Sequence, residues 1–496
     1  MVFESSGIQR GADGVARYTG LEPNVVRGFA ATAAAHPDRI AVVELDGGTA
    51  TYRDLWEGAE RVAGGLHAAG VGPGDRVAIG LPNGLAWMLA FWGAQLAGAV
   101  VVPLNTRLAP AEREFVLADS GAVVVLDSAD LPDGDPVEPA DPARGDLAAL
   151  FYTSGTTGRP KGAMLTQECF VSAAENVQRC RELDPALSNV SLISVPLFHV
   201  TGCCSQMVTQ VLMGGTTVLM PKFSPAAFLA AVAEHRVTLL TSVPTIYELV
   251  LRHPDLASTD VSSVRALSYG GAPMAPELVH RLRRAFPGAR LGNGFGLSET
   301  SALATFLPDA WADEHADSVG FPAPVVDVRL DRPDPVSGIG ELLVRGQNVA
   351  VGYWGMPEAT SEAFRDGWLH TGDLATIDDE GLVHIVDRAK DMINRGGENV
   401  YSVEVENALA EHPDVLEVAV VGVPDDVMGE KVGAVVLVRG PLDLAEFAAF
   451  ARHRLADYKV PQFVRLLDGP LPRNAGGKVV KGPLRTAEGW TPVPRG

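Results

Sequence analysis

Short apolar runs alternate with stretches of helical periodicity through the first three quarters of the chain. Strands are predicted for "RVAIGL" (76–81), "AVVVPL" (99–104), "AVVVLD" (122–127), "TTVLM" (216–220) and "VTLLTSVP" (237–244). Helices are predicted between them, for instance at 85–98 and 225–236. Runs that are apolar throughout are typical of strands buried on both faces of a parallel sheet. The alternation therefore predicts layered α/β architecture, in which ligands bind at the loops that leave the strands.

The last part of the chain follows a different pattern. Short strands are predicted at 341–346 and 382–388, separated by the turn "DDEGL". A compact unit follows, with predicted helices at 402–412 and 444–456 and strands at 415–423 and 432–438. We therefore expect a large N-terminal domain of layered α/β sheets over 1–389 and a small α+β domain over 390–496.

The stretch from Val77 to Thr106 carries no charge, which raises the question of a membrane helix. A membrane span needs about twenty consecutive apolar residues. Here Pro82, Gly98 and Pro103 interrupt the run, so a buried strand–helix–strand unit is the better interpretation. The acidic, proline-rich segment 127–147 is predicted to be an exposed loop.

Composition narrows the range of partners. The 496 residues include 47% hydrophobic and 20% charged residues, which is typical of a globular chain with more than one domain. A formal charge of −21 argues against a nucleic-acid partner, because phosphate binding over a large surface needs a basic face. An anionic small molecule held by local cations stays compatible with this charge.

Cysteine usage and the N-terminus suggest a compartment. The spacing of Cys169, Cys180, Cys203 and Cys204 suits neither an ordinary disulfide nor a zinc site, so we expect reduced thiols in the core. The first residues contain no apolar segment of a secretory leader. A cytoplasmic protein without a transmembrane segment is predicted; the oligomeric state stays open, with a homodimer among the alternatives.

The run "YTSGTTGRPKGAML" (152–165) is the strongest local signal for ligand binding. It follows the apolar run "LAALFY", so it is a loop leaving a strand. Glycines let the backbone approach a ligand, and hydroxyls and cations suit polyphosphate. The loop contributes Thr153, Ser154, Gly155, Thr156, Thr157, Gly158, Arg159 and Lys161. It lacks the Walker A spacing, so composition alone leaves two alternatives, a decorated surface loop or a different nucleotide-binding loop.

Further motifs decide between these alternatives. The loop closely resembles the signature loop of the adenylate-forming superfamily, which includes acyl-CoA synthetases, luciferases and the adenylation domains of peptide synthetases. The other motifs of that superfamily follow in its order: "SYGGAPM" (268–274), "NGFGLSET" (293–300), "GYW" (352–354), "WLHTGDLA" (368–375), "IVDRAKDMINRGGENVYSVEVENAL" (385–409) and "LPRNAGGKVVKGPLR" (471–485). The resemblance covers nearly the whole chain after the first few dozen residues.

The resemblance implies a reaction in two steps. A carboxylate attacks the α-phosphate of ATP to give an acyl-adenylate and pyrophosphate, and the thiol of coenzyme A then displaces AMP. Lys478 matches the catalytic lysine of adenylation, Glu299 the residue that positions Mg²⁺, and Thr300 the residue that meets the α-phosphate. Both motifs also have a non-catalytic alternative: Lys478 could be one more lysine of a basic tail, and "SET" could cap a helix.

The resemblance also implies the nucleotide-binding residues. Asp373 matches the ribose ligand, helped by Arg388, although an aspartate after a glycine could be a turn residue. The superfamily places an aromatic ring against adenine where Phe295 stands. The surrounding nucleotide site is formed by Gly270, Gly271, Ala272, Pro273, Asn293, Gly294 and Gly296.

The small domain is implied to move. Lys390 matches the hinge about which that domain rotates between the two steps. Gly396 and Gly397 could lie close to the pantetheine arm of coenzyme A. Many relatives have proline where Ser402 stands, and we expect Ser402 to cap the following helix with Glu404 in its first turn.

The pocket for the acid is predicted to be apolar. His199 falls where relatives place a gate between the ATP and acyl sites, although a lone histidine is often structural. The other expected lining residues are Val243, Ile246, Tyr247, Tyr269, Gly271, Gly294, Gly296 and Leu297. None of them is a cation, and burying a second carboxylate without a partner is costly. The expected substrate is a hydrophobic monocarboxylic acid: a medium or long fatty acid, an aryl acid or a fused-ring acid.

The sequence offers three alternatives to acyl-CoA synthetase activity. An enzyme could load the acyl group onto a separate carrier protein, but no carrier domain follows "KGPLRTAEG" in this sequence, which favours free coenzyme A. A luciferase-like oxygenase would need added chemistry. A catalytically silent nucleotide sensor is disfavoured because Lys161, Glu299, Asp373 and Lys478 are all present.

Overall fold

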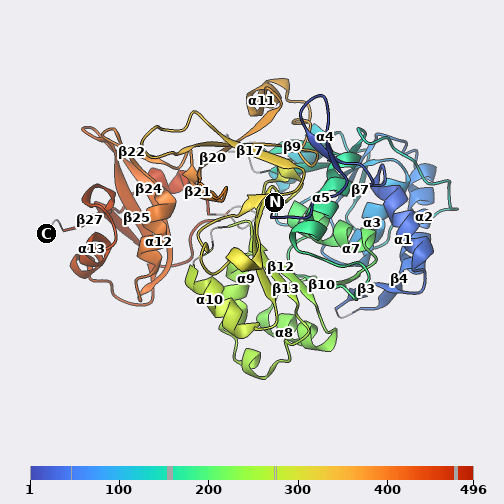
Figure 1. The fold of residues 1–496 in the computed structure, drawn as a ribbon, viewed down its shortest axis with the longest axis horizontal. Coiled ribbons are helices and arrows are strands. Elements are labelled where there is room, and N and C mark those ends of the chain that lie inside the picture. The colour runs from blue at the N-terminus through green and yellow to red at the C-terminus, as the bar shows by residue number, and fades with distance from the viewer. Residues whose placement is uncertain are drawn as a thin grey trace. The chain divides into compact units, whose positions relative to one another are not determined.

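The computed structural model describes residues 2–45, 47–153, 160–272, 274, 276–473 and 479–494. The chain divides into two compact units (Figure 1). The first contains Met1–Val328, Leu343–His370 and Asp379–Val383, and the second contains Arg329–Leu342, Thr371–Asp378 and His384–Gly496. The division falls inside strands β17 (Val326–Asp331), β18 (Gly340–Gly346), β20 (Trp368–Ile377) and β21 (Val383–Arg388). A functional boundary at residue 390 stays a prediction.

A sheet of nine described strands forms one half of the first unit, in the order β16-β15-β14-β13-β12-β10-β11-β3-β4. Its central pairs are parallel, as the buried apolar runs predicted. The strands are β3 (Ile40–Glu44), β4 (Thr49–Thr51), β10 (Val190–Ile193), β11 (Thr216–Leu219), β12 (Leu239–Ser242), β13 (Ala266–Gly270), β14 (Arg290–Phe295), β15 (Thr305–Leu307) and β16 (Phe321–Pro322). In Figure 1, α8, α9 and α10 lie beside β10, β12 and β13.

A second sheet of the first unit has the order β7-β5-β6-β8-β9. Its members are β5 (Arg76–Ile79), β6 (Val100–Pro103), β7 (Val124–Leu126), β8 (Leu147–Thr153) and β9 (Lys161–Thr166). The strands β5, β6, β7 and β8 pair in parallel, and β9 returns antiparallel to β8. The run "YTSGTTGRPKGAML" (152–165), called the phosphate-loop motif from here on, therefore joins the ends of two paired strands. The small hairpin β1 (Ile8–Arg10) and β2 (Ala16–Tyr18) precedes both sheets.

Helices cover these sheets and bury their apolar faces against them. The helices of the first unit are α1 (Val25–Ala35), α2 (Tyr52–Ala68), α3 (Leu85–Leu96), α4 (Pro110–Ser120), α5 (Gln167–Cys180), α6 (Val200–Gly202), α7 (Thr209–Leu212), α8 (Pro225–Glu234), α9 (Pro244–Leu251), α10 (Pro276–Ala285) and α11 (Pro357–Ala363). Helix α3 lies in the core, with Trp87, Phe91 and Trp92 fully buried. Within the described residues, no helix is both long and apolar enough to cross a membrane. The prediction of a buried strand–helix–strand unit at Val77–Thr106 is thus confirmed.

The second unit is a small α+β assembly, as predicted. Its main sheet has the order β23-β22-β25-β26-β27, with β24 paired to β25. The elements are β22 (Ile393–Arg395), β23 (Glu398–Val400), α12 (Ser402–Ala410), β24 (Val415–Asp425), β25 (Gly429–Val438), α13 (Leu444–Arg452), β26 (Phe463–Leu467), α14 (Gly482–Arg485) and β27 (Thr491–Pro492). The central parts of β24 and β25 are apolar throughout: Val420, Val432, Ala434 and Val436 form the core with α12 and α13, and Ala419, Val421 and Val435 form a second cluster with Leu471 and Leu484.

The predictions for the cysteines and for the exposed loop are confirmed, whereas the prediction for one helix cap is wrong. The four cysteines are free and buried, and 127–146 contains neither helix nor strand among its residues. The prediction that Ser402 caps α12 is wrong: the cap position is Tyr401, and the Ser402 hydroxyl donates instead to Asp387. A buried carboxylate from a neighbouring strand outcompeted the local backbone for this hydroxyl.

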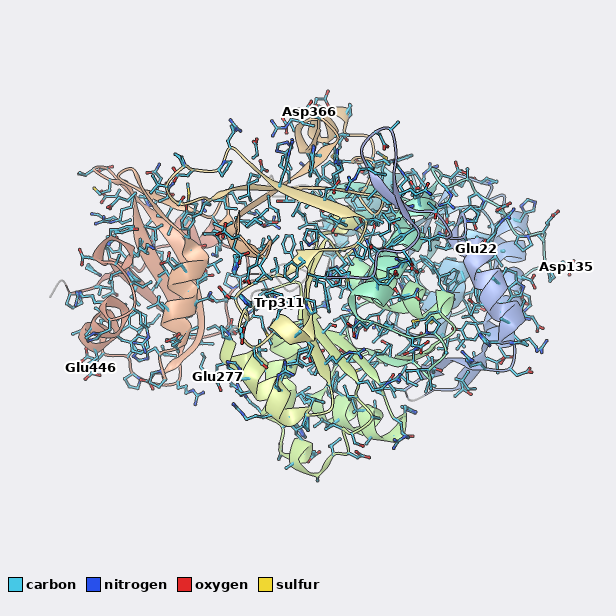
Figure 2. The ribbon with its side chains drawn as sticks, viewed as in Figure 1. Glu22, Asp135, Glu277, Trp311, Asp366 and Glu446 are labelled. Carbon is cyan, nitrogen blue, oxygen red and sulfur yellow. The ribbon has the colours of Figure 1, made fainter. Side chains whose placement is uncertain are left out.

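The acidic character of the chain is a property of its surface. Asp135, Glu277, Asp366 and Glu446 are exposed on four separate elements or loops (Figure 2). Arginine and lysine side chains pair with many other carboxylates, for example Arg283 with Asp309 and Asp313.

Candidate active site

The phosphate-loop motif is framed by its two ends. Thr153 is the last residue of β8 and lies opposite Lys161, the first residue of β9, in the antiparallel ladder. This pairing brings the two ends of the loop together and fixes Lys161 on a rigid strand. The predicted ligands Ser154, Gly155, Thr156, Thr157 and Gly158 and the neighbouring Arg159 lie outside the described residues.

The segment 348–354, which contains the "GYW" motif, runs along β9. The N–H of Trp354 donates to the carbonyl of Gly162 at 2.8 Å. The N–H of Met164 donates to the carbonyl of Gly352 at 2.9 Å, and that of Val351 to the carbonyl of Met164 at 3.1 Å. The segment is therefore fixed to the strand that starts at Lys161.

The opposite side of the same segment holds the "LSET" turn. The N–H of Ala350 donates to the carbonyl of Glu299 at 2.7 Å. The side-chain amide of buried Asn348 donates to the carbonyls of Thr300 and Leu303, both at 2.8 Å. The turn is tight: Ser298–Thr300 form a short 3₁₀ helix, followed by positive φ values at Ser301 (52°) and Ala302 (95°). Positive φ at two residues other than glycine in succession is costly and is found where the surroundings enforce it.

Thr300, the last residue of the 3₁₀ helix, is fully buried. Its hydroxyl accepts from the N–H of Leu297 at 2.8 Å and contacts the carbonyl of the same residue at 3.1 Å. A role at the α-phosphate stays a prediction for this residue.

The structure brings Lys161 and Glu299 to the same tyrosine. The Tyr353 hydroxyl donates to Glu299 Oε1 at 2.8 Å, and Lys161 Nζ lies 5.0 Å from the centre of the Tyr353 ring. Tyr353 is 8% exposed, whereas Glu299 and Lys161 are partly exposed. Sequence reasoning noticed the "GYW" motif without giving Tyr353 a role. Its only signal was the motif itself, because 54 residues separate Tyr353 from Glu299.

The glycines of the predicted adenine site allow a close approach of two parallel strands. Gly270 of β13 lies opposite Gly294 of β14, and a Cβ atom at Gly270 would stand 2.0 Å from the carbonyl oxygen of Gly294. A Cβ atom at Gly296 would stand 1.5 Å from the carbonyl oxygen of Ala302. Gly271 has a φ of +74°, so the chain turns where β13 ends.

The remaining residues of the predicted adenine site differ in exposure. Phe295 is partly exposed at the end of β14, and Ala272 is exposed. Asn293 is buried, and its amide donates to the carbonyl of Ser318 at 2.9 Å, which holds β14 in place. Pro273 lies outside the described residues.

The predicted acyl-pocket residues fall into two groups. Val243, Ile246 and Leu297 are partly exposed. Tyr247 and Tyr269 are buried within the hydrophobic cluster between β12, β13 and the helices α9 and α10. The Tyr247 hydroxyl donates to the carbonyl of Ser268 at 2.8 Å, and burial raises the pKa of both phenols. The first group is accessible to a ligand, while the second packs beneath it.

His199 stands at the entrance of an unusual helix. Its carbonyl accepts the N–H groups of Gly202 and Cys203, and its ring lies 4.7 Å from that of Phe198. A π-helical turn follows over Cys203–Val208. Such turns are rare and are frequent at functional sites.

The two residues of the second unit that are predicted to bind the ribose form an ion pair with each other. Arg388 Nε lies 2.6 Å from Asp373 Oδ1, and the Asp373 carboxylate is almost fully buried. The N–H of Ala389 donates to the carbonyl of Gly372 at 3.0 Å, which connects "TGD" with "VDR". Burial is the largest cause of a lowered pKa at Lys390, the predicted hinge.

The other residues predicted on this unit lie beyond Lys390. Gly396 and Gly397 have positive φ values of 63° and 94°, and the N–H of Gly396 donates to the carbonyl of Met428 at 2.8 Å. Lys478 lies outside the described residues.

The donor set suits a hard cation. Within the described residues, the hydrogen bond to Tyr353 uses one oxygen of Glu299, and no ion pair of Glu299 is present. Mg²⁺ binds oxygen and commonly takes one or two carboxylates together with the phosphates of a nucleotide. A carboxylate on a rigid turn near a lysine on the phosphate-loop strand fits that requirement.

Comparison with known families identifies both parts of the chain. The pattern of the family described as "AMP-binding enzyme" matches residues 29–136 and 127–354. The pattern described as "AMP-binding enzyme C-terminal domain" matches residues 404–478.

Several curated relatives and solved structures match most of the chain. A feruloyl-CoA synthase of Amycolatopsis sp is 43% identical over an alignment of 469 residues that covers 88% of this chain and 94% of that protein. The long-chain-fatty-acid–CoA ligase FadD13 of Mycobacterium tuberculosis is 36% identical over 470 residues, covering 88% and 92%. The o-succinylbenzoate CoA synthetase (MenE) of Bacillus subtilis, solved with its acyl-adenylate intermediate, has a TM-score of 0.85 at 31% identity and covers 94% and 99%.

Proposed function

This chain belongs to the AMP-binding enzyme family, and from that premise we propose that it is an ATP-dependent acyl-CoA synthetase for a hydrophobic monocarboxylic acid. The observation that carries the proposal is the convergence of "KGAML", "LSET" and "GYW" on one segment of the first unit. Three motifs that are far apart in the sequence thus meet at one place. Together they supply a cation, a carboxylate and backbone donors, which a site for a nucleoside triphosphate needs.

In the first step, the phosphate loop and Lys161 bind the phosphates of ATP, and Phe295 packs against adenine. Glu299 would hold Mg²⁺, which neutralises phosphate charge. The substrate carboxylate attacks the α-phosphorus, the bond to the bridging oxygen breaks, and pyrophosphate leaves. Lys478 stabilises the charge that develops on the transferred group, a contribution that preorganised cations make in water-poor sites.

In the second step, the thiol of coenzyme A attacks the acyl carbon and AMP leaves. Asp373 and Arg388 orient the ribose of the nucleotide. Rotation of residues 390–496 about Lys390 would exchange Lys478 for the backbone of Gly396 and Gly397 beside the pantetheine arm. A single chain position can carry such a motion by changing its backbone angles.

The substrate class follows from polarity. Val243, Ile246 and Leu297 offer apolar, partly exposed surface, and His199 would separate this surface from the nucleotide, as the resemblance implies. Two of these relatives are named for ferulate, an aryl acid, and for long-chain fatty acids, and both substrates carry a single carboxylate on an apolar body. Ferulate and related aryl acids are therefore the first substrates to test.

The test is pyrophosphate release from ATP and Mg²⁺ with aryl, C4–C18 fatty and fused-ring acids, with and without coenzyme A. We expect acid-dependent pyrophosphate release and a CoA thioester for at least one monoacid. Background release with every acid contradicts the proposal. Faster turnover of malonate or succinate than of any monoacid contradicts the assigned pocket, and adenylate without thioester would favour a carrier protein as acceptor.

A further inference from the structure

The "GYW" motif has no part in the reaction as described, yet Tyr353 touches two of its central residues. Its hydroxyl donates to Glu299 Oε1 at 2.8 Å, and its ring faces the ammonium of Lys161, with 5.0 Å between Nζ and the ring centre. Tyrosine can do both because its hydroxyl is polar and its ring face attracts cations.

Tyr353 is itself held from several sides. Its N–H donates to the hydroxyl of Thr360, in the middle of α11, at 2.9 Å. The ring of Phe364 packs edge-on at 5.6 Å between centroids. Next to it, the N–H of Trp354 donates to the carbonyl of Gly162 on β9. The side chain is 8% exposed, so these contacts restrict its rotamer.

The same segment also fixes the main chain of the "LSET" turn. The N–H of Ala350 donates to the carbonyl of Glu299, and the side-chain amide of Asn348 donates to that of Thr300. One short segment therefore sets both the main-chain position and the side-chain orientation of the residue predicted to hold the metal.

We infer that Tyr353 is a positioning residue that orients the Glu299 carboxylate for Mg²⁺·ATP and sets its separation from Lys161. The inference rests on the proposed function, because it needs ATP and Mg²⁺ as ligands. The hydroxyl of Tyr353 occupies one oxygen of Glu299 and directs the carboxylate plane. Partners of this kind outside the ligand shell restrict ligand orientation, and their loss commonly weakens metal binding.

The two contacts make separable contributions. Tyr353→Phe removes the hydrogen bond to Glu299 and retains the ring beneath Lys161. Tyr353→Leu removes both. The first substitution should affect only binding that involves the metal, whereas the second should also weaken binding of metal-free ATP through Lys161.

The experiment measures ATP binding to the whole chain by calorimetry without an acid substrate, in EDTA and in saturating Mg²⁺. The quantity of interest is the factor by which Mg²⁺ lowers the dissociation constant. Tyr353→Phe should reduce this factor by about tenfold and change the constant in EDTA by less than about twofold. A lower Mg²⁺ affinity in pyrophosphate release should accompany it.

Tyr52→Phe is the matched control. Tyr52 is fully buried in the first unit, and its hydroxyl donates to the carbonyl of Gly215 at 2.7 Å, so the same atom and the same kind of bond are lost. We expect this variant to lose stability and to retain the wild-type effect of Mg²⁺.

A double-mutant cycle tests whether Tyr353 acts through Glu299. On a Glu299→Gln background, Tyr353→Phe should have no further effect on the Mg²⁺-dependent factor, because coupled residues are not additive. Additive effects, an unchanged factor in Tyr353→Phe, or equal weakening in EDTA and Mg²⁺ would each overturn the inference. Absence of ATP binding in the wild-type protein would instead overturn the proposed function, and with it the need for a positioned metal.

Discussion

Close backbone approach is the main constraint on single residues of the candidate site. Gly270 faces Gly294 across two parallel strands, and the space between them has no room for a methyl group. The motif "SYGGA" was recognised in the sequence, but the reason for its first glycine was visible only once β14 was placed beside β13.

Gly270→Ala should therefore destabilise the first unit by about 2–3 kcal/mol, because the new Cβ atom would overlap a backbone carbonyl that cannot rotate away. Gly288→Ala is the matched control: the nearest atom to its Cβ would be the carbonyl oxygen of Val264, at 3.8 Å. The melting temperatures of both variants, measured by calorimetry, are compared with that of the wild-type protein. Equal melting temperatures would show that β13 and β14 can separate without cost.

Individual side-chain partners were the least predictable feature. Lys161 and Glu299 were identified from their motifs, but their common contact with Tyr353 depends on a hydrogen bond between residues 54 positions apart. Asn348 also holds the "LSET" turn from a distance of 48 residues in the sequence. Such contacts are set by tertiary packing, for which a single sequence carries no periodicity or spacing signal.

At the scale of elements, α12 is attached to the rest of its unit by a buried polar network. Ser402 donates to Asp387 from its N–H and its hydroxyl, and Lys481 Nζ lies 2.7 Å from both Ser402 Oγ and Glu406 Oε1. Burial is the largest cause of a raised pKa at Asp387 and at Glu406, and the positive charge of Lys481 opposes it. Lys481 therefore favours the charged form of both carboxylates.

Lys481→Met should lower stability at pH 7.5 by about 3 kcal/mol and lower it less at pH 5. Without the cation both pKa values rise further above their ordinary values of 3.8 and 4.5, so the folded chain binds more protons than the unfolded chain. Stability then falls as pH rises through the folded pKa values.

Melting temperatures at the two pH values provide the measurement. Lys459→Met is the control, because Lys459 pairs with Glu404 on the outer side of the same helix, where the carboxylate is 42% exposed. An equal loss at both pH values for Lys481→Met would show that the carboxylates are not coupled to this lysine.

Element types were predicted well where periodicity was strong. The strands at 76–79, 100–103 and 216–219 and the helices α3 and α8 all lie within the predicted stretches. The beginning of α12 at Ser402 was predicted correctly, but its cap was not. A serine at the start of a helical pattern is a local signal for a cap, whereas the competing carboxylate of Asp387 comes from strand β21.

For the whole molecule, the change from long α/β alternation to a short α+β pattern correctly predicted two kinds of architecture. The compact units do not follow one cut in the sequence, since residues 329–342 and 371–378 group with the later part of the chain. The two compact units reflect packing, whereas a hinge is defined by motion. The assignment of Lys390 as the hinge therefore needs a kinetic test.

The last prediction separates the two half-reactions. Lys478→Ala should slow adenylate formation by about a hundredfold to a thousandfold, because a preorganised charge is lost from phosphoryl transfer. It should leave thioester formation from a supplied acyl-adenylate nearly intact. Lys222→Ala, which removes an exposed lysine, is the control for a general loss of charge.

Lys390→Pro should have the reverse effect, because proline fixes φ at the hinge and penalises rotation. The carbonyl of Lys390 accepts a hydrogen bond from the Arg485 guanidinium at 2.5 Å. Within the described residues, the backbone N–H of Lys390 makes no hydrogen bond. Proline therefore removes no observed hydrogen bond, and we expect the variant to fold, form adenylate and stop there. Single-turnover measurement of each step decides. Equal slowing of both steps by Lys478→Ala contradicts the division of labour, and a normal thioester step in Lys390→Pro removes the hinge from Lys390.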